Sequence, residues 1–81
     1  MPRRVKVIEK KLGRERAWGQ AFHGLDELEI DPRQPPKEYL DTLIHEALHL
    51  AHPGLDEPTV SDVATFLARV LWQQNYRKVN Q

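Results

Sequence analysis

The sequence predicts an α+β domain in which a small antiparallel sheet of about three strands is followed by two packed helices. Short segments of alternating apolar and polar residues fill the first third of the chain, whereas apolar residues recur at helical spacing in the remainder. With 81 residues, the chain makes a single domain. We expect a β-rich part over residues 1–31, a first helix over 36–52 and a last helix over 57–78.

Three segments of the first third are predicted strands. Residues 5–9 are rich in β-branched side chains, residues 28–31 alternate between apolar and charged side chains, and residues 16–22 place their aromatic side chains on one face. Their short connections favour antiparallel pairing. We expect Trp18 in the second strand, and Trp72 in the last helix, to lie in the core or at its edge.

The first helix follows a loop that contains three prolines between residues 32 and 36. Within the range 36–52, the helix runs through roughly residues 37–51 and ends near His52, because a proline and a glycine follow. At 100° per residue its apolar side chains form one stripe. The stripe consists of Leu40, Leu43, Ile44, Ala47, Leu48 and Ala51. His45, Glu46 and His49 lie outside it, on a face that could line a cleft.

The last helix is predicted to begin beside Pro58, since proline is tolerated in a first helical turn. It carries an apolar stripe suited to packing against the first helix. The stripe consists of Val60, Val63, Ala64, Leu67, Val70 and Leu71.

Composition excludes several classes of protein and of site. The 12 basic residues are balanced by 12 acidic ones, which disfavours a nucleic-acid partner. The absence of cysteine excludes disulfides and thiolate zinc sites, so any metal must be held by His, Asp or Glu. No apolar run approaches the roughly 20 residues that span a bilayer, and no signal peptide is recognisable. We therefore expect a cytoplasmic protein without a membrane partner.

The segment His45-Glu46-Ala47-Leu48-His49 has the spacing H-E-x-x-H on a predicted helix. Residues i and i+4 project from the same helical face about 6 Å apart, so both imidazoles can bind one tetrahedral zinc ion. Glu46 lies beside the open coordination position and can accept a proton from water. The motif predicts a Zn2+ site with His45 and His49 as ligands and Glu46 as general base. Two histidines and a carboxylate also suit iron or other divalent ions.

A zinc site of this class needs a third protein ligand. Glu57 follows the proline-glycine break after the first helix, where the chain can turn back toward the histidines. His52 lies about 10 Å along a regular helix from His45, so it could ligate only if the last turn unwinds. Asp56 is better suited to capping the final helix. Spacing thus favours Glu57 and leaves His52 and Asp56 as alternatives.

Residues 42–49, with the strand and the proline loop before them, resemble the active-site region of zincins, the HExxH metallopeptidases. The chain is similar to minimal gluzincins and to short predicted metallopeptidases of phages and bacteria, over roughly residues 27–71. In gluzincins the third ligand is a glutamate on a later helix, and Glu57 would match it. Its separation from His49 is shorter than in larger gluzincins. The resemblance implies a zinc metallopeptidase that acts on a peptide or protein.

The resemblance also implies how substrate is held. In this group a strand beside the active-site helix pairs with the extended peptide, and residues 28–31 or 16–22 would provide that strand here. A His, Tyr or Arg near the metal usually stabilises the oxyanion of the transition state. His23, Tyr39 and Tyr76 are the candidates for this role.

A different class of function fits the same residues, namely a non-catalytic, zinc-stabilised module that binds a partner protein. A metal would compensate for the small core of such a short chain. Structural zinc sites have four protein ligands, whereas catalytic sites keep a position for water. Ligation by both Glu57 and His52 would therefore indicate this alternative.

Overall fold

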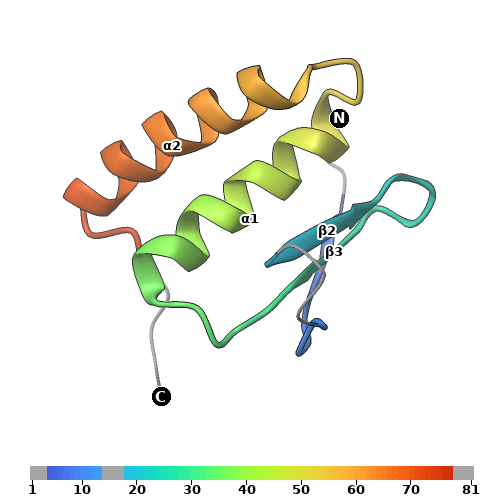
Figure 1. Cartoon of the computed structure of the whole chain (residues 1–81), viewed down its shortest axis with the longest axis horizontal. Coiled ribbons are helices and arrows are strands. Elements are labelled where there is room, and N and C mark those ends of the chain that lie inside the picture. The colour runs from blue at the N-terminus through green and yellow to red at the C-terminus, as the bar shows by residue number, and fades with distance from the viewer. Residues whose placement is uncertain (1–3, 14–17, 78–81) are drawn as a thin grey trace.

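The computed structural model describes residues 4–13 and 18–77. The elements are, in order, β1 (Lys6–Glu9), β2 (Gly19–Phe22), the short 3-10 helix η1 (His23–Leu25), β3 (Glu27–Ile30), α1 (Pro36–Ala51) and α2 (Glu57–Gln73). α1 lies between α2 and the sheet (Figure 1), which confirms the α+β class. The beginning of the strand predicted over 16–22, and the end of the helix predicted to reach 78, lie outside the described residues.

The sheet is mixed, so the prediction of an antiparallel sheet was wrong. Its strand order is β1-β3-β2. β3 pairs antiparallel with β2, with Gly19 opposite Ile30, and parallel with β1, with Val7 opposite Leu28. Alternation of apolar residues identifies a strand but says nothing of which strand lies beside it. Because β3 is central, residues 28–31 offer no free edge, and β2 is the outer strand next to α1.

The core lies between the sheet and α1. Leu28 and Ile30 of β3 are buried, and they pack with Tyr39 and Leu50 of α1. The two glutamates of β3 alternate with these apolar residues and are only half-buried. Burial of these four apolar side chains holds α1 on the sheet, since each contributes about 1.5–3 kcal/mol relative to an exposed position.

The face of α1 that is buried differs from the predicted apolar stripe. Tyr39, Glu46 and Leu50 are the buried residues of this helix, whereas Ala47 and Ala51 are exposed. Because the sheet covers one side of α1 and α2 covers another (Figure 1), no single apolar stripe describes its buried residues, and the predicted stripe was wrong at Ala47 and Ala51. The most consequential error of the prediction concerns Glu46, which is buried although it was predicted to lie outside the buried face.

α2 covers the other side of α1 through small apolar side chains. Val60, Ala64 and Ala68 are buried, and small residues allow two helices to approach closely. Leu67 and Val70 were predicted in this stripe, yet they are 37% and 40% exposed. Neither helix in the described part of the chain is sufficiently long and apolar to span a bilayer.

The helix boundaries follow from local backbone chemistry. α1 begins at Pro36 and is capped at His52, whose N–H donates to the Leu48 carbonyl at 2.8 Å. α2 ends at Gln73, earlier than predicted, because Asn75 adopts a left-handed conformation with φ of 67°. This geometry lets the N–H of Tyr76 bond back to the carbonyl of Leu71 at 2.9 Å and terminates the helix.

Asp31 fixes the loop that leads into α1. Its buried carboxylate accepts hydrogen bonds from the N–H of Leu12 and the N–H of Arg33, both at 3.0 Å, and from the Arg33 guanidinium at 2.6 and 2.9 Å. The side-chain bond from Arg33 is the main reason that the pKa of Asp31 lies well below its usual range. The loop is thereby tied to the segment after β1.

Candidate metal centre

His45, His49 and Glu57 form one group of metal-ligating side chains. Each offers a ligand atom, and these atoms lie within 4.8 Å of one another. Oε1 of Glu57 is 2.6 Å from Nε2 of His45, and Oε2 is 3.3 Å from Nε2 of His49. Two imidazoles and a carboxylate are the ligand set of one type of catalytic zinc site. The group could hold a metal ion, as the spacing of the sequence predicted.

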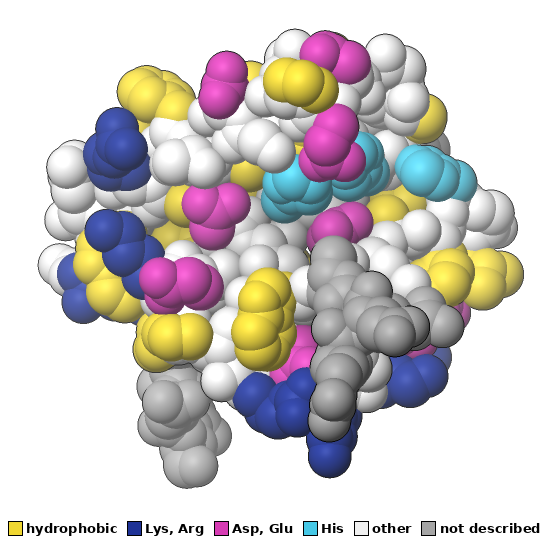
Figure 2. Space-filling view, in the orientation of Figure 1, with side chains coloured by type: hydrophobic (Ala, Val, Ile, Leu, Met, Phe, Trp, Pro, Cys, Tyr) yellow, Lys and Arg dark blue, Asp and Glu magenta, His cyan; other side chains and the backbone are white. Residues whose placement is uncertain are grey.

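Two helices bring this group together. His45 and His49 are one turn apart on α1, and their ring centroids are 4.9 Å apart with an interplanar angle of 64°. Glu57 is the first residue of α2, so the turn between the helices delivers its carboxylate to both rings. The side chains are open to solvent, with exposed fractions of 22% for His45, 24% for His49 and 63% for Glu57. In Figure 2, histidine side chains lie at the surface among acidic ones.

Glu46 lies between the two histidines in sequence and is only 8% exposed. Burial raises the pKa of its carboxyl, the charges of His45 and His49 oppose that shift, and the charge of Glu57 adds to it. A raised pKa brings a carboxyl closer to the working pH, where a general base is most effective. Its buried position beside the metal-ligating group therefore suits proton transfer.

Gly19 explains how Glu46 becomes buried. A β-carbon at Gly19 would lie 2.7 Å from Cγ2 of Thr42, 3.0 Å from Cγ of Glu46 and 3.1 Å from Cδ1 of Ile30. Only a residue without a side chain allows the backbone of β2 to approach α1 this closely. The sequence interpretation missed this contact, although a lone glycine inside a predicted strand is a signal for it.

The two alternative third ligands lie outside the group. His52 is the exposed C-cap of α1, and Asp56 is the exposed N-cap of α2. Asp56 accepts the N–H of Val60 through its backbone carbonyl at 3.0 Å, and its side chain makes no capping hydrogen bond. Among the described residues, the metal-ligating group contains Glu57 and neither of these alternatives.

The three candidate oxyanion stabilisers are not members of the group either. Nε2 of His23 lies 2.8 Å from the backbone carbonyl of His49, which anchors η1 to the last turn of α1. The hydroxyl of Tyr39 donates to Oε2 of Glu9 at 2.8 Å. Tyr76 is 66% exposed and lines, together with Tyr39, a different cavity. His23 is therefore held against the turn of α1 that carries His49, and the role of all three in stabilising an oxyanion stays a prediction.

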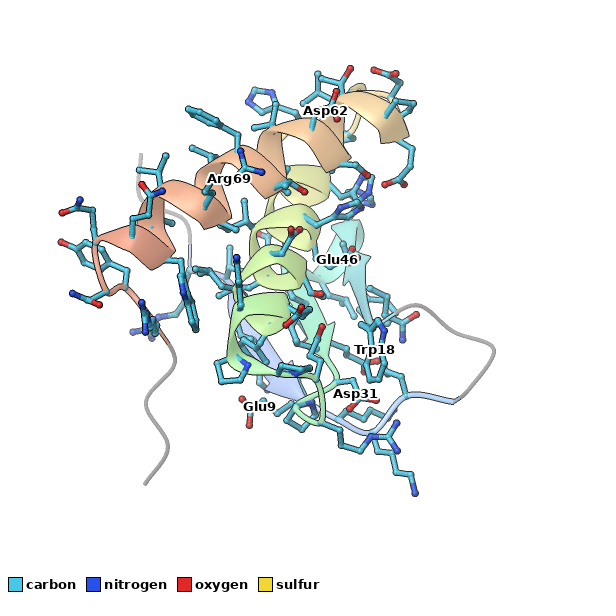
Figure 3. All side chains as sticks on the ribbon, turned by 60° about the vertical axis from the view of Figure 1, so that its left-hand side comes forward. Glu9, Trp18, Asp31, Glu46, Asp62 and Arg69 are labelled. Atoms are coloured by element: carbon cyan, nitrogen blue, oxygen red, sulfur yellow. The ribbon has the colours of Figure 1, made fainter. Side chains whose placement is uncertain are left out.

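The two tryptophans differ in how far they are buried. Trp72 is half-buried, as expected of a residue at the edge of the core. The guanidinium carbon of Arg77 lies over its ring, 3.8 Å from the ring centroid. Trp18 is 53% exposed, so its predicted place in or beside the core was wrong. It directly precedes β2 and lies on the same side of α1 as Glu46 (Figure 3).

Comparison of the chain with protein-family models, curated proteins and solved structures gave no match.

Proposed function

We propose that this chain is a zinc-dependent metallopeptidase of the minimal zincin type. The observation that carries the proposal is the convergence of His45, His49 and Glu57 within 4.8 Å, beside the buried carboxyl of Glu46. Three protein ligands leave a fourth tetrahedral position for water, as in catalytic zinc sites, whereas structural sites use four protein ligands. This count favours an enzyme over a zinc-stabilised interaction module.

The residues have distinct roles in the proposed hydrolysis. A zinc ion held by His45, His49 and Glu57 would polarise the scissile carbonyl and lower the pKa of water to about 7. Glu46 accepts a proton from the attacking water as the new C–O bond forms. It then passes this proton to the amine nitrogen as the C–N bond breaks.

β2 supports the proposal by offering a free edge beside Glu46. It pairs with β3 on one side and contacts α1, and no described strand lies along its other edge. The carbonyl of Trp18 accepts the N–H of Asp31 at 2.8 Å. Because backbone groups alternate along a strand, those of Gly19 and Ala21 point to the free edge. An extended peptide can pair there by β-augmentation.

The test combines metal content with peptide cleavage. We expect about one zinc per chain by elemental analysis, and loss of this zinc in the His45→Ala/His49→Ala variant. Glu46→Gln should retain the zinc and lose turnover of a mixed peptide library followed by mass spectrometry, because an amide cannot accept the proton. Asp62→Asn, an exposed change on α2, serves as control and should retain both properties.

The outcomes separate the two classes of function. Retained turnover in Glu46→Gln would contradict the catalytic assignment. Zinc binding without cleavage of any peptide in the library would favour the non-catalytic, zinc-stabilised module. A folded protein that takes up no zinc would overturn both functions.

A further inference from the structure

A pocket lies between Trp18 and the first turns of α1, and we call it the Trp18 pocket. It has a volume of about 330 Å³, which falls in the range of small-molecule sites. It is lined by Trp18, Gln34, Pro35, Glu38, Asp41 and Thr42. The presence of the exposed Trp18 distinguishes this pocket from two larger cavities among the described residues, whose linings contain no tryptophan.

The Trp18 pocket and the metal-ligating group share one face of α1. Asp41 lies one turn before His45, and Thr42 lies one turn before Glu46, which is a separation of about 6 Å along the helix. Gly19, next to Trp18, approaches Thr42 and Glu46 together. A peptide paired with the free edge of β2 at Glu46 therefore passes the pocket within one or two residues of the scissile bond.

The polar groups of the pocket favour a cation. The amide of Gln34 is engaged within the protein, because it donates to the Asp31 carbonyl at 3.0 Å and accepts from the Thr42 hydroxyl at 2.8 Å. The carboxylate of Glu38 is exposed, and that of Asp41 accepts the Thr65 hydroxyl at 3.1 Å with capacity for further bonds. Among the described residues, the lining includes no lysine or arginine.

The helix terminus beside the pocket does not reverse this preference. The N-terminus of a helix attracts anions through its free N–H groups. Here the N-cap and the first helical residue are Pro35 and Pro36, which have no N–H to donate. Glu38 adds a negative charge in the same turn. The pocket therefore combines two carboxylates with an aromatic face, and this combination attracts ammonium and guanidinium groups.

We propose that the Trp18 pocket binds the side chain of a lysine or arginine in the peptide, close to the bond that is cut. The aliphatic part of that side chain packs on Trp18, and its charged end lies between Glu38 and Asp41. This inference rests on the proposed peptidase function and adds a substrate class to it, namely peptides with a basic residue beside the scissile bond.

Peptide binding can be measured separately from cleavage. In the zinc-loaded Glu46→Gln/Trp72→Phe protein, Trp18 is the single tryptophan, so its fluorescence reports on the pocket directly. The probes are three blocked peptides that differ at one residue, which is lysine, norleucine or glutamate. We expect the lysine peptide to bind about fivefold or more tightly than the norleucine peptide, in line with one exposed cation–π contact and nearby carboxylates.

Variants of the lining identify the cause of the preference. Glu38→Gln/Asp41→Asn should reduce the lysine preference to about one, with binding of the norleucine peptide unchanged. Asp62→Asn removes an equivalent charge from α2 and should retain the preference. Equal binding of lysine and norleucine peptides, an unchanged Trp18 signal with every peptide, or a preference that survives in the double variant would each overturn the proposal.

Cleavage of the same peptides distinguishes this inference from the proposed function. Cleavage by the zinc-loaded native protein without a preference for lysine refutes the pocket assignment alone. Selective binding of the lysine peptide without cleavage refutes the peptidase alone and leaves the pocket as a binding site for basic peptides.

Discussion

Oε1 of Glu57 lies 2.6 Å from Nε2 of His45, and this contact joins the first residue of α2 to the middle of α1. Because 63% of the Glu57 side chain is exposed, this contact alone contributes little to stability. A metal ion held by the same atoms would hold the two helices together much more strongly. The packing of α2 on α1 should therefore depend on metal.

Zinc is expected to raise the thermal stability of the chain. At free zinc 100 times the dissociation constant, the gain is about 2.7 kcal/mol, which corresponds to roughly 10 °C or more for a domain of this size. Glu57→Ala should weaken zinc binding by at least about tenfold. Calorimetry of zinc binding and thermal unfolding followed by circular dichroism measure both effects.

The alternative ligands provide the controls for this experiment. His52→Ala and Asp56→Asn change exposed residues that lie outside the metal-ligating group. Both should bind zinc like the native chain. If either variant loses as much affinity as Glu57→Ala, the assignment of the third ligand is wrong.

Gly19→Ala should lower the free energy of unfolding by about 1–3 kcal/mol, because the new methyl group collides with Thr42. Thr42→Ser removes the Cγ2 methyl nearest to it and retains the hydroxyl that bonds Gln34. The double variant should therefore be more stable than the sum of the two single losses predicts. Urea unfolding measures these free energies.

Gly54→Ala is the matched control, since no atom lies within 4 Å of the added β-carbon. It should change stability by less than about 0.5 kcal/mol. Strict additivity of Gly19→Ala and Thr42→Ser would show that their contact does not limit the approach of β2.

Asp31 should make the stability of the chain depend on pH in the acid range. The pKa of Asp31 in the folded state is lowered, chiefly by the side chain of Arg33. A lowered folded pKa gives stability that is present above the unfolded value of about 3.9 and is lost as pH falls through the folded pKa. In urea unfolding from about pH 6 down to 2, the stability difference between the native chain and Asp31→Asn should shrink. When both of these chains also carry the exposed change Asp62→Asn, the same pH-dependent difference in stability should persist between them.

Tyr39 should make the stability of the chain depend on pH in the alkaline range. Burial, followed by the hydrogen bond to Glu9 and the charge of Glu9, raises the pKa of Tyr39 to about 12. Because this exceeds the unfolded value of about 10, the contribution is fully present below about pH 10 and is lost as pH rises toward 12. Tyr39→Phe should lower stability by about 1 kcal/mol at neutral pH. Tyr76→Phe, at an exposed tyrosine, should have no comparable effect in the same urea unfolding measurements.

Local spacing was enough to predict both helices and the grouping of His45, His49 and Glu57. Positions i and i+4 meet on any helix, and a proline-glycine break lets the chain turn back, so that Glu57 can lie near the preceding helix. These are relationships between residues that are close in sequence. The structure groups the same three residues.

Relationships between distant segments could not be predicted in this way. The parallel pairing of β1 with β3 requires knowledge of which strand lies beside which. The burial of Glu46 depends on Gly19, which is 27 residues earlier in the sequence. The exposure of Trp18 depends on how β2 lies against α1, whereas its size and apolar character predicted burial.

The strand order has a kinetic consequence. β2, β3, α1 and α2 follow one another in the chain and contact their neighbours, whereas β1 must wait for β3 before it has a partner. Closing that longer loop costs entropy, so we expect β1 to join after the folding transition state. Ile8→Ala should then speed unfolding and leave the folding rate nearly unchanged, whereas Leu28→Ala should slow folding, as stopped-flow chevron plots would show. The last strand to join would be the first to detach, while the segment with the metal-ligating residues stays folded.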